Sequence, residues 1–389
     1  MNDVYSMSMP IGYTASGLPV PVFYDPHYAI RINKPPVTLI TGSPGSGKTF
    51  AALLFASHAA LLNKITFVLD PKDDFTSLIN LQRAGEIENV KVWSIFSQGE
   101  VREENIGMLD PTCLTDDMHE NASLTLQTIS TLSSGLTPKQ RNAIIPIIQD
   151  VTQSENPSMR TIVTLLARSR DEDISSLSHE LNMALSMPAG RLLVASSKQR
   201  QRFNFKSGLV VASLLGLSLP PSSKSEDTYL DKEKLAVSIM RLLTHLVLDI
   251  MKKVPSSINK LLIIDEAWAV FNNEAGRSLI DEVALLGRTL NMATILATQS
   301  PSHIKAAKGQ SSLENTISTR FAFRNNSDED NNINVKEMGL PMDHGYQSTF
   351  KEFTPGMCLM KDSQEQFQFV DITLPKDWIK MLSTTPTPD

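Results

Sequence analysis

One short segment, residues 42–49, restricts the fold of this chain more than any other. Its sequence, Gly-Ser-Pro-Gly-Ser-Gly-Lys-Thr, matches the pattern G-x-x-x-x-G-K-[ST] at every defined position. A buried-strand pattern precedes it at residues 37–41, and a helical pattern with Phe50, Leu53 and Leu54 on one face follows it. In this context the loop backbone can curl so that its N–H groups point at phosphate oxygens. We therefore predict a phosphate-binding loop; the alternative is a glycine-rich turn that binds nothing.

The residue types in this loop indicate a nucleoside triphosphate with a metal ion. Lys48 is expected to reach the β- and γ-phosphates of ATP, and the hydroxyl of Thr49 is expected to bind Mg²⁺. The helix that begins here would add the positive end of its dipole. The predicted nucleotide-binding residues of the loop are Gly42, Ser43, Pro44, Gly45, Ser46, Gly47, Lys48 and Thr49.

Two acidic residues follow a second apolar strand pattern, at residues 261–264. In a parallel sheet, Asp265 and Glu266 would lie at the carboxyl ends of the strands, where ligands bind in open α/β sheets. We expect Asp265 to hold the metal ion through water, and Glu266 to polarise the water that attacks the γ-phosphate. The alternative is a strand that ends in a solvated acidic turn.

Side chains around the next strand, residues 293–297, are candidates for the same site. Gln299 follows this strand and could sense the γ-phosphate, orient water or be an ordinary polar strand end. Arg288 precedes the strand and could act as an arginine finger on the ATP of a neighbouring subunit. Arg320 and Arg324 are further candidates for this role. For each arginine, the alternative is a surface ion pair.

Three weaker features complete the candidate residues. Asp70 follows the strand at residues 65–69 and could bond to the phosphate loop, join the magnesium shell or be a plain strand-end acid. The basic segment 198–202, with Phe203 and Phe205, could touch a nucleic-acid backbone, although a solvated loop is favoured. Trp268 is expected in the core rather than in the wall of a nucleotide pocket.

The order of strand and helix patterns predicts an α/β fold with a mainly parallel central sheet flanked by helices. Residues 112–205 carry short amphipathic helical patterns, which predict an all-α insertion subdomain. The expected domains are a lead-in at 1–35, an ATPase core at 36–111 and 206–380, the insertion at 112–205 and a flexible tail at 381–389. Further predictions are a helix start at Thr137, helices at 160–169, 175–185 and 231–253, an N-cap at Asn273, and hairpins around 20–24 and 357–372.

The composition excludes several classes of protein. Apolar residues make up 41% of the 389 residues, which supports a buried core, and the net charge of -6 argues against a protein that mainly coats DNA. Two cysteines exclude a disulfide scaffold, and the seven histidines show no metal-binding spacing. We find no secretory signal, and the most apolar run near the N-terminus, 51–62, is shorter than the ~20 residues of a membrane span. A cytoplasmic protein, or a peripheral one at the inner face of the cell membrane, is expected.

The chain resembles a known family in three segments: Asp-Glu-Ala-Trp at 265–268, Gly-Arg-x-x-Asn at 287–291 and Leu-Ala-Thr-Gln at 296–299. These are similar to motifs of the large conjugation ATPase of type IV secretion systems, the TraC/ConE-like family in the FtsK/HerA branch of RecA-like motors. Further similarity at 31–36, 70–71, 109–111 and 209–220 extends the resemblance over about residues 30–380. Asp73 and Asp74 stand where the family has Gly-Glu.

This resemblance implies a RecA-like P-loop ATPase core that forms a homo-oligomeric ring, expected to be a hexamer, at the cytoplasmic base of a secretion channel. It implies channel and coupling proteins as partners, and DNA or a DNA–protein complex as the substrate. It also implies the roles given above for Lys48, Thr49, Asp265, Glu266, Gln299 and Arg288. The alternatives are a DNA-pumping translocase of the FtsK/HerA type and an ATP-gated assembly scaffold with little turnover. Since family members carry a large N-terminal domain, we expect either a C-terminal part of a longer chain or a shortened member.

Overall fold

The computed structural model describes residues 8–15, 17–133, 135–195, 207–221, 224–271, 274–304, 316–342 and 345–382. Contacts within the chain divide it into two compact units. The first comprises residues 1–93, 206–213 and 254–389, and the second comprises residues 94–205 and 214–253. The predicted insertion at 112–205 therefore lies in the second unit, which also contains the helix at 231–253.

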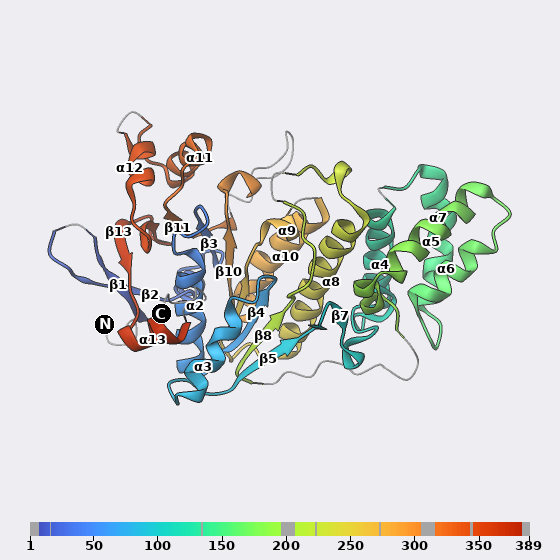
Figure 1. Cartoon of the computed structure of the whole chain (residues 1–389), viewed down its shortest axis with the longest axis horizontal. Coiled ribbons are helices and arrows are strands. Elements are labelled where there is room, and N and C mark those ends of the chain that lie inside the picture. Colours follow the sequence, from blue (N-terminus) through green and yellow to red (C-terminus); the bar gives the residue numbers. More distant parts are fainter. Residues whose placement is uncertain are drawn as a thin grey trace. The chain divides into compact units, whose positions relative to one another are not determined.

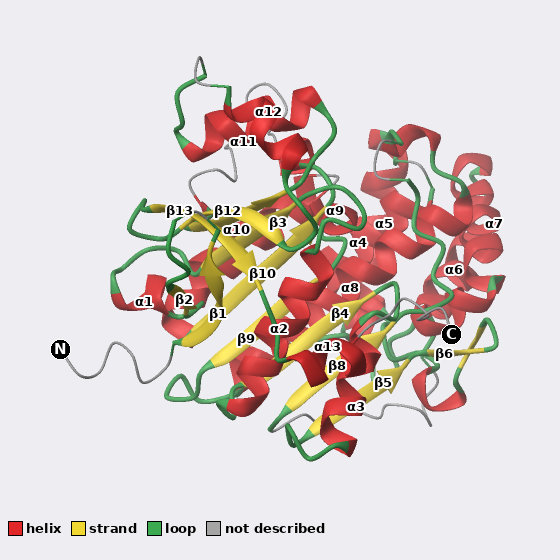
Figure 2. Ribbon diagram, turned by 60° about the vertical axis from the view of Figure 1, so that its left-hand side comes forward, coloured by secondary structure: helices red, strands yellow, loops and turns green. Residues whose placement is uncertain are grey.

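Among the described residues, the first unit contains an 11-stranded sheet, whose strands are labelled in Figure 1 or, for β9 and β12, in Figure 2. In spatial order the strands are β2 (Pro21–Tyr24), β1 (Met9–Thr14), β13 (Phe367–Ile372), β12 (Met357–Lys361), β11 (Thr319–Phe323), β3 (Val37–Thr41), β10 (Met292–Thr298), β9 (Lys260–Ile264), β4 (Ile65–Asp70), β8 (Leu209–Ser213) and β5 (Val90–Ser94). The strands from β11 to β8 pair in parallel, and those from β2 to β11 pair antiparallel. The predicted parallel centre and both predicted hairpins are therefore confirmed.

The position of β10 decides which loops meet. It lies between β3 and β9 and runs parallel to both, with Thr298 opposite Thr41 and Leu296 opposite Ile264. Strand β4 continues the row beyond β9, with Leu69 opposite Ile264. The carboxyl ends of these four strands therefore lie together, and the loops that leave them can form one site.

Helices cover the sheet and bury its apolar side chains. The elements α2 (Lys48–Leu61), α3 (Leu78–Arg83) and α13 (Lys376–Leu382) share one hydrophobic core with the strands, and Figure 2 shows them on one face of the sheet. On the other face, α10 (Glu274–Leu290) packs along β10. The remaining helices of this unit are α1 (Tyr28–Arg31), α9 (Trp268–Phe271), α11 (Asp328–Met338) and α12 (Tyr346–Glu352).

A cluster of buried charged side chains lies at the amino ends of β4 and β9. Asp25 faces Arg31 at 2.7 Å and Lys64 at 3.3 Å. His27 Nε2 lies 2.9 Å from the carbonyl oxygen of Lys260 and must be the donor, because a carbonyl can only accept. In a neutral imidazole Nδ1 is then the acceptor, and it accepts from Lys64 Nζ at 3.2 Å. Burial would raise the pKa of Asp25, but the hydrogen bonds of His27 and the charge of Lys64 hold it below its ordinary value. This cluster fastens residues 25–31 to the sheet.

Within its described residues, the second unit contains helices and one short hairpin, β6 (Phe96–Ser97) with β7 (Glu100–Val101). Its helices are α4 (Met118–Leu132), α5 (Pro138–Thr152), α6 (Met159–Ala167), α7 (Glu172–Ser186) and α8 (Asp231–Lys253). The predicted start of α5 is confirmed, because Thr137 and Gln140 cap each other's backbone N–H groups as a capping box. The predicted α8 has the expected bounds. Helix α4 is an addition to the predicted helices.

Candidate active site

The phosphate-loop pattern lies between β3 and α2, as predicted. Gly42 has φ 155°, and a Cβ atom there would lie 2.7 Å from Cβ of Phe323. Gly47, the residue before α2, has φ 106°, and its Cβ would lie 2.8 Å from the backbone nitrogen of Gly356. Both positions therefore require glycine. The loop is fixed from outside by two backbone bonds, Ser43 N to Arg324 O and Gly356 N to Ser46 O, each 2.9 Å.

Two side chains in this loop are suited to an anionic ligand. The hydroxyl of Ser46 is buried and has no hydrogen-bond partner among the described residues. Lys48 is buried and donates from Nζ to the carbonyl oxygen of Ser43 at 3.1 Å. Burial lowers the pKa of Lys48 to about 8, against the opposing charges of Asp265 and Glu266. This electrostatic coupling places the predicted lysine and the predicted acids in one site.

Asp265, at the end of β9, has the properties of a metal ligand. It is 4% exposed, and its Oδ2 atom is buried without a hydrogen-bond partner among the described residues. Burial, and then the neighbouring charge of Glu266, raise the pKa of Asp265 to about 7. A divalent cation would satisfy the free oxygen and neutralise the carboxylate. Asp265 and the half-buried Thr49 thus fit Mg²⁺, which would supply charge neutralisation for phosphate oxygens when bound.

Glu266 is held by three donors from three different segments. Its Oε1 accepts from Gln299 Nε2 at 3.1 Å and from Lys72 Nζ, and its Oε2 accepts from Trp268 Nε1 at 2.6 Å. Burial would raise the pKa of Glu266, but the hydrogen bond and charge of Lys72 hold it below its ordinary value. The backbone of Glu266 has φ 50°, an uncommon left-handed conformation for a residue other than glycine. The structure therefore brings Glu266 and Gln299 together.

The three candidate arginines have different surroundings. Arg288 is exposed near the end of α10, and its guanidinium donates to the carbonyl oxygen of Asn33 at 3.2 Å. Arg320 is 7% exposed and pairs with Glu337 at 2.6 Å. This buried ion pair disfavours the predicted role of Arg320 on a neighbouring subunit. The carbonyl of Arg324 fixes the phosphate loop, and its Nε atom is buried without a hydrogen-bond partner among the described residues.

Asp70 is fully buried and its carboxylate caps the turn that follows β4. The two oxygens accept from the backbone N–H groups of Asp74 at 3.1 Å and Phe75 at 2.8 Å. Burial raises the pKa of Asp70 to about 7, although these hydrogen bonds oppose the rise. The contacts of Asp70 thus favour the strand-end alternative over a bond to the phosphate loop.

No role was predicted for Lys72, although its side chain contacts Glu266. Lys72 lies in the turn after β4, and β4 is the neighbour of β9. The sequence Asp-Pro-Lys-Asp-Asp at 70–74 places a lysine between acids, which is a signal for an ion pair. The pairing with Glu266 could not be predicted without knowing that β4 and β9 are adjacent. Trp268 is 3% exposed, as expected of a core residue, and it also donates to Glu266.

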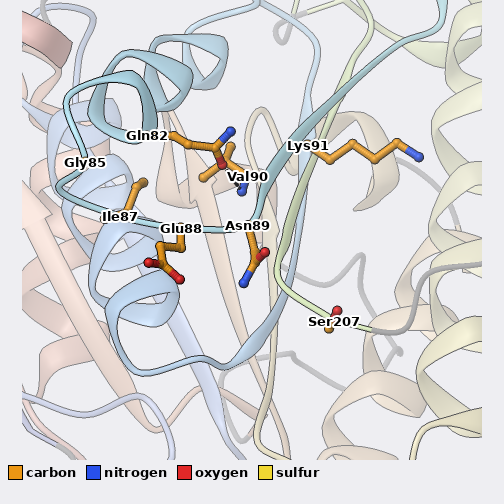
Figure 3. Close-up of a pocket in the computed structure, with 8 residues that line it drawn as sticks. All are labelled: Gln82, Gly85, Ile87, Glu88, Asn89, Val90, Lys91 and Ser207. Carbon is orange, nitrogen blue, oxygen red and sulfur yellow. Dashed lines mark hydrogen bonds between the residues drawn. The ribbon is translucent and has the colours of Figure 1, made fainter.

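Several other predictions concern parts of the chain outside this site. The basic segment 198–202 with Phe203 and Phe205, the N-cap at Asn273 and residues 383–389 lie outside the described residues. Figure 3 shows a separate hollow of about 660 Å³ at the turn between α3 and β5, lined by Gln82, Glu88, Asn89, Lys91 and their neighbours. None of the predicted site residues lines it. Within the described residues, no helix combines the length and apolar composition that a membrane crossing requires.

Comparison with known proteins assigns the chain to a family. The sequence model of the family described as "AAA-like domain" matches residues 31–382. The curated protein YddE of Bacillus subtilis (strain 168), described as uncharacterized, is 20% identical over 366 residues, which is 90% of this chain but 43% of YddE. The chain therefore spans less than half the length of that relative.

Solved structures show the same fold. VirB4 of Thermoanaerobacter pseudethanolicus aligns with a TM-score of 0.73 and 14% identity, covering 95% of this chain and 97% of VirB4. The bacterial conjugative coupling protein TrwB aligns with a TM-score of 0.53 and 13% identity, covering 94% of this chain and 89% of TrwB. The predicted RecA-like P-loop fold is therefore confirmed.

Proposed function

The chain belongs to the AAA-like domain family, and we propose that it is an ATP-hydrolysing motor subunit of a type IV secretion or conjugation machine. One observation carries the ATPase part of this proposal. The phosphate loop with Lys48, the acids Asp265 and Glu266, and Gln299 come from three neighbouring strands and meet at their carboxyl ends. A phosphate-binding loop beside a metal-binding carboxylate and a general base is the arrangement that phosphoryl transfer to water requires.

In the proposed reaction, each of these residues acts on ATP or on the attacking water. Lys48 and the loop N–H groups hold the β- and γ-phosphates, while Thr49 and Asp265 hold Mg²⁺. Glu266 takes a proton from water as the water oxygen bonds to the γ-phosphorus and the bond from phosphorus to the ADP oxygen breaks. Gln299 orients Glu266 or the water. Arg288 from a neighbouring subunit stabilises the charge that develops on the transferred phosphoryl group.

The proposed cellular role rests on two kinds of similarity. The fold matches VirB4 over nearly the whole of both chains, and it matches TrwB, a conjugative coupling protein. The segments 265–268, 287–291 and 296–299 resemble the conjugation ATPases. We infer that residues 36–111 and 206–380 act as the ATPase core and 112–205 as its helical insertion, in a ring at the cytoplasmic base of a channel.

The test is the ATPase rate per subunit, measured against protein concentration. We compare the wild type with Lys48→Ala, which removes the phosphate contact, with Arg288→Ala, and with Lys351→Ala, which changes an exposed ion pair elsewhere. We expect the rate per subunit to rise with concentration, both site variants to be inactive and Lys351→Ala to match the wild type. A flat rate with a fully active Arg288→Ala variant would refute the arginine finger.

Two further results would favour the alternatives. Nucleotide binding without hydrolysis at any concentration would support an ATP-gated scaffold. Strong stimulation by added duplex DNA would support a DNA-pumping translocase, which would use all of the same ATPase residues.

A further inference from the structure

Three donors already occupy most of the roughly four acceptor positions of the Glu266 carboxylate. Oε1 already accepts from Gln299 and Lys72, and Oε2 accepts from Trp268. A general base must accept a hydrogen bond from the water that it deprotonates. Of the three donors, Lys72 is the only one that carries a full positive charge, so it competes most strongly for the carboxylate.

The position of Lys72 allows this contact to be broken. Its side chain is 50% exposed, whereas that of Glu266 is 6% exposed and Trp268 is buried. Lys72 also lies close enough to Lys48 for the two cations to repel each other. An anion held by Lys48 would therefore attract Lys72 as well, and would draw it away from Glu266.

The turn that carries Lys72 is anchored on both sides. Asp70 caps the backbone of Asp74 and Phe75, and Asp73 accepts a hydrogen bond from the hydroxyl of Ser213 at the end of β8. The chain passes from Ser213 directly into the second compact unit at Leu214. The turn that carries Lys72 is therefore hydrogen-bonded to the last residue before the second unit.

We propose that Lys72 is a positioning residue that withholds Glu266 from water until bound nucleotide draws the lysine away. This proposal rests on the proposed ATPase function and adds a control step to it. Lys72 needs no direct role in bond breaking for this step. Its release frees one acceptor position on Oε1, and Gln299 and Trp268 then hold the carboxylate in place for the attacking water.

Indole NMR tests the contact without measuring hydrolysis. The chain has three tryptophans, and ¹⁵N labelling of their side chains gives three Nε1–H signals, with Trp268 identified by Trp268→Phe. Trp378 also donates to a carboxylate, Glu86 Oε2 at 3.1 Å, and serves as the internal control. We expect Lys72→Met, or wild-type protein with Mg²⁺ and the slowly hydrolysed analogue ATPγS, to shift the Trp268 signal and leave that of Trp378 in place. Lys72→Arg should keep the Trp268 signal at its wild-type position.

Steady-state kinetics test the consequence for hydrolysis. We expect Lys72→Met to raise kcat by about threefold or more, because the base no longer waits for the lysine to leave it. Lys253→Met is the matched control, because the Lys253 side chain is also 50% exposed and ion-paired. It should leave kcat and KM unchanged.

Each outcome bears on one proposal. A fall in kcat for Lys72→Met, or a Trp268 signal that neither Lys72→Met nor nucleotide moves, would overturn the control by Lys72. If the wild type hydrolyses no ATP while the Trp268 signal still responds to ATPγS and to Lys72→Met, the ATPase proposal fails and the contact itself stands. If the wild type hydrolyses ATP but Lys72→Met behaves like Lys253→Met, only the control by Lys72 fails.

Discussion

Buried carboxylates at the two ends of the parallel strands differ in whether they have charged partners. At the amino ends, Asp25 lies between two cations, Lys64 and Arg31, and its pKa is below its ordinary value. At the carboxyl ends, Asp265 has an oxygen without a hydrogen-bond partner among the described residues, and its pKa is raised to about 7. Folding alone disfavours such an oxygen, because a buried polar atom loses its water. The amino-end carboxylate is therefore compensated by charged partners, whereas the carboxyl-end carboxylate keeps an oxygen whose burial costs stability until a ligand satisfies it.

The largest expected effect is on activity at the carboxyl ends. Replacing Glu266 by Gln removes the proton acceptor and should lower kcat by about 100-fold or more. Glutamine keeps the size of the side chain, but its NH₂ group cannot accept a hydrogen bond, so one of the three donors loses its acceptor and the free energy of unfolding should fall by about 1–3 kcal/mol. An ATPase assay and a thermal melt on the same preparation check both points. A variant that keeps the wild-type rate would show that Glu266 is not the base.

The largest effect on stability is expected at the amino ends. Asp25→Ala would leave Lys64, whose side chain is 4% exposed, buried without its acidic partner, which costs about 3–5 kcal/mol. Urea unfolding measures this loss. The control is Arg31→Ala, which removes a partly exposed partner of the same carboxylate and should cost less than about 1 kcal/mol. Equal losses for the two variants would contradict the importance of the buried pair.

Asp265→Asn should stabilise the protein without nucleotide at neutral pH. Because the pKa of Asp265 is about 7 in the fold and near 3.8 when unfolded, both states are protonated below pH 4 and differ as the pH rises. The unfolded chain loses its proton first, so the free energy of unfolding falls between about pH 4 and pH 7. The variant lacks this loss and should gain about 4 kcal/mol at pH 7, because each pKa unit between the two states is worth about 1.4 kcal/mol.

Unfolding at several pH values checks this sign. The wild type should lose stability from pH 4 to pH 7 more steeply than Asp265→Asn, and Asp70, with a pKa also about 7, should supply the slope that remains. A variant that is less stable than the wild type at pH 7 would show that Asp265 has a stabilising partner.

The smallest effect is expected from Asp73→Gly, at a position where this chain departs from the family resemblance. Asp73 has φ 68°, the left-handed conformation that glycine adopts freely. Glycine should therefore be tolerated within about 1 kcal/mol, the worth of the lost hydrogen bond to Ser213. Asp73→Val, which cannot adopt this φ easily, should cost clearly more. Thermal melts of both variants show whether position 73 requires the left-handed backbone conformation or the side-chain contact with Ser213.

The local parts of this structure and the meeting of the central strand ends were predictable from the sequence, whereas the side-chain contacts between distant turns were not. The phosphate loop, the capping box at Thr137 and the bounds of α8 depend on residues close in sequence, and each was predicted. The amino-end cluster joins Asp25 to Lys64, 39 positions apart, and His27 to Lys260, 233 positions apart. No periodic pattern in the sequence marks these contacts. The bond between Lys72 and Glu266 spans 194 positions and depends on β4 being next to β9.

Some elements were missed because their patterns are weak. Helix α11 contains Asp328, Glu329, Asp330 and several asparagines, and has few apolar side chains to reveal a helical period. It is stabilised instead by acidic residues in its first turn, by the cap at Ser327 and by Gly339 at its end. Arg320 was predicted either as a catalytic arginine or as part of an ion pair, and its contact with Glu337 favours the ion pair.

The two outside bonds of the phosphate loop have a consequence for the order in which this protein becomes functional during synthesis. The loop at 42–49 is synthesised before the residues that fix it, because Ser43 bonds to Arg324 and Ser46 bonds to Gly356. A nascent chain therefore carries its most recognisable motif without these partners until residues 324 and 356 have been made. We expect the loop to take its binding shape only after β11 and β12 have joined the sheet.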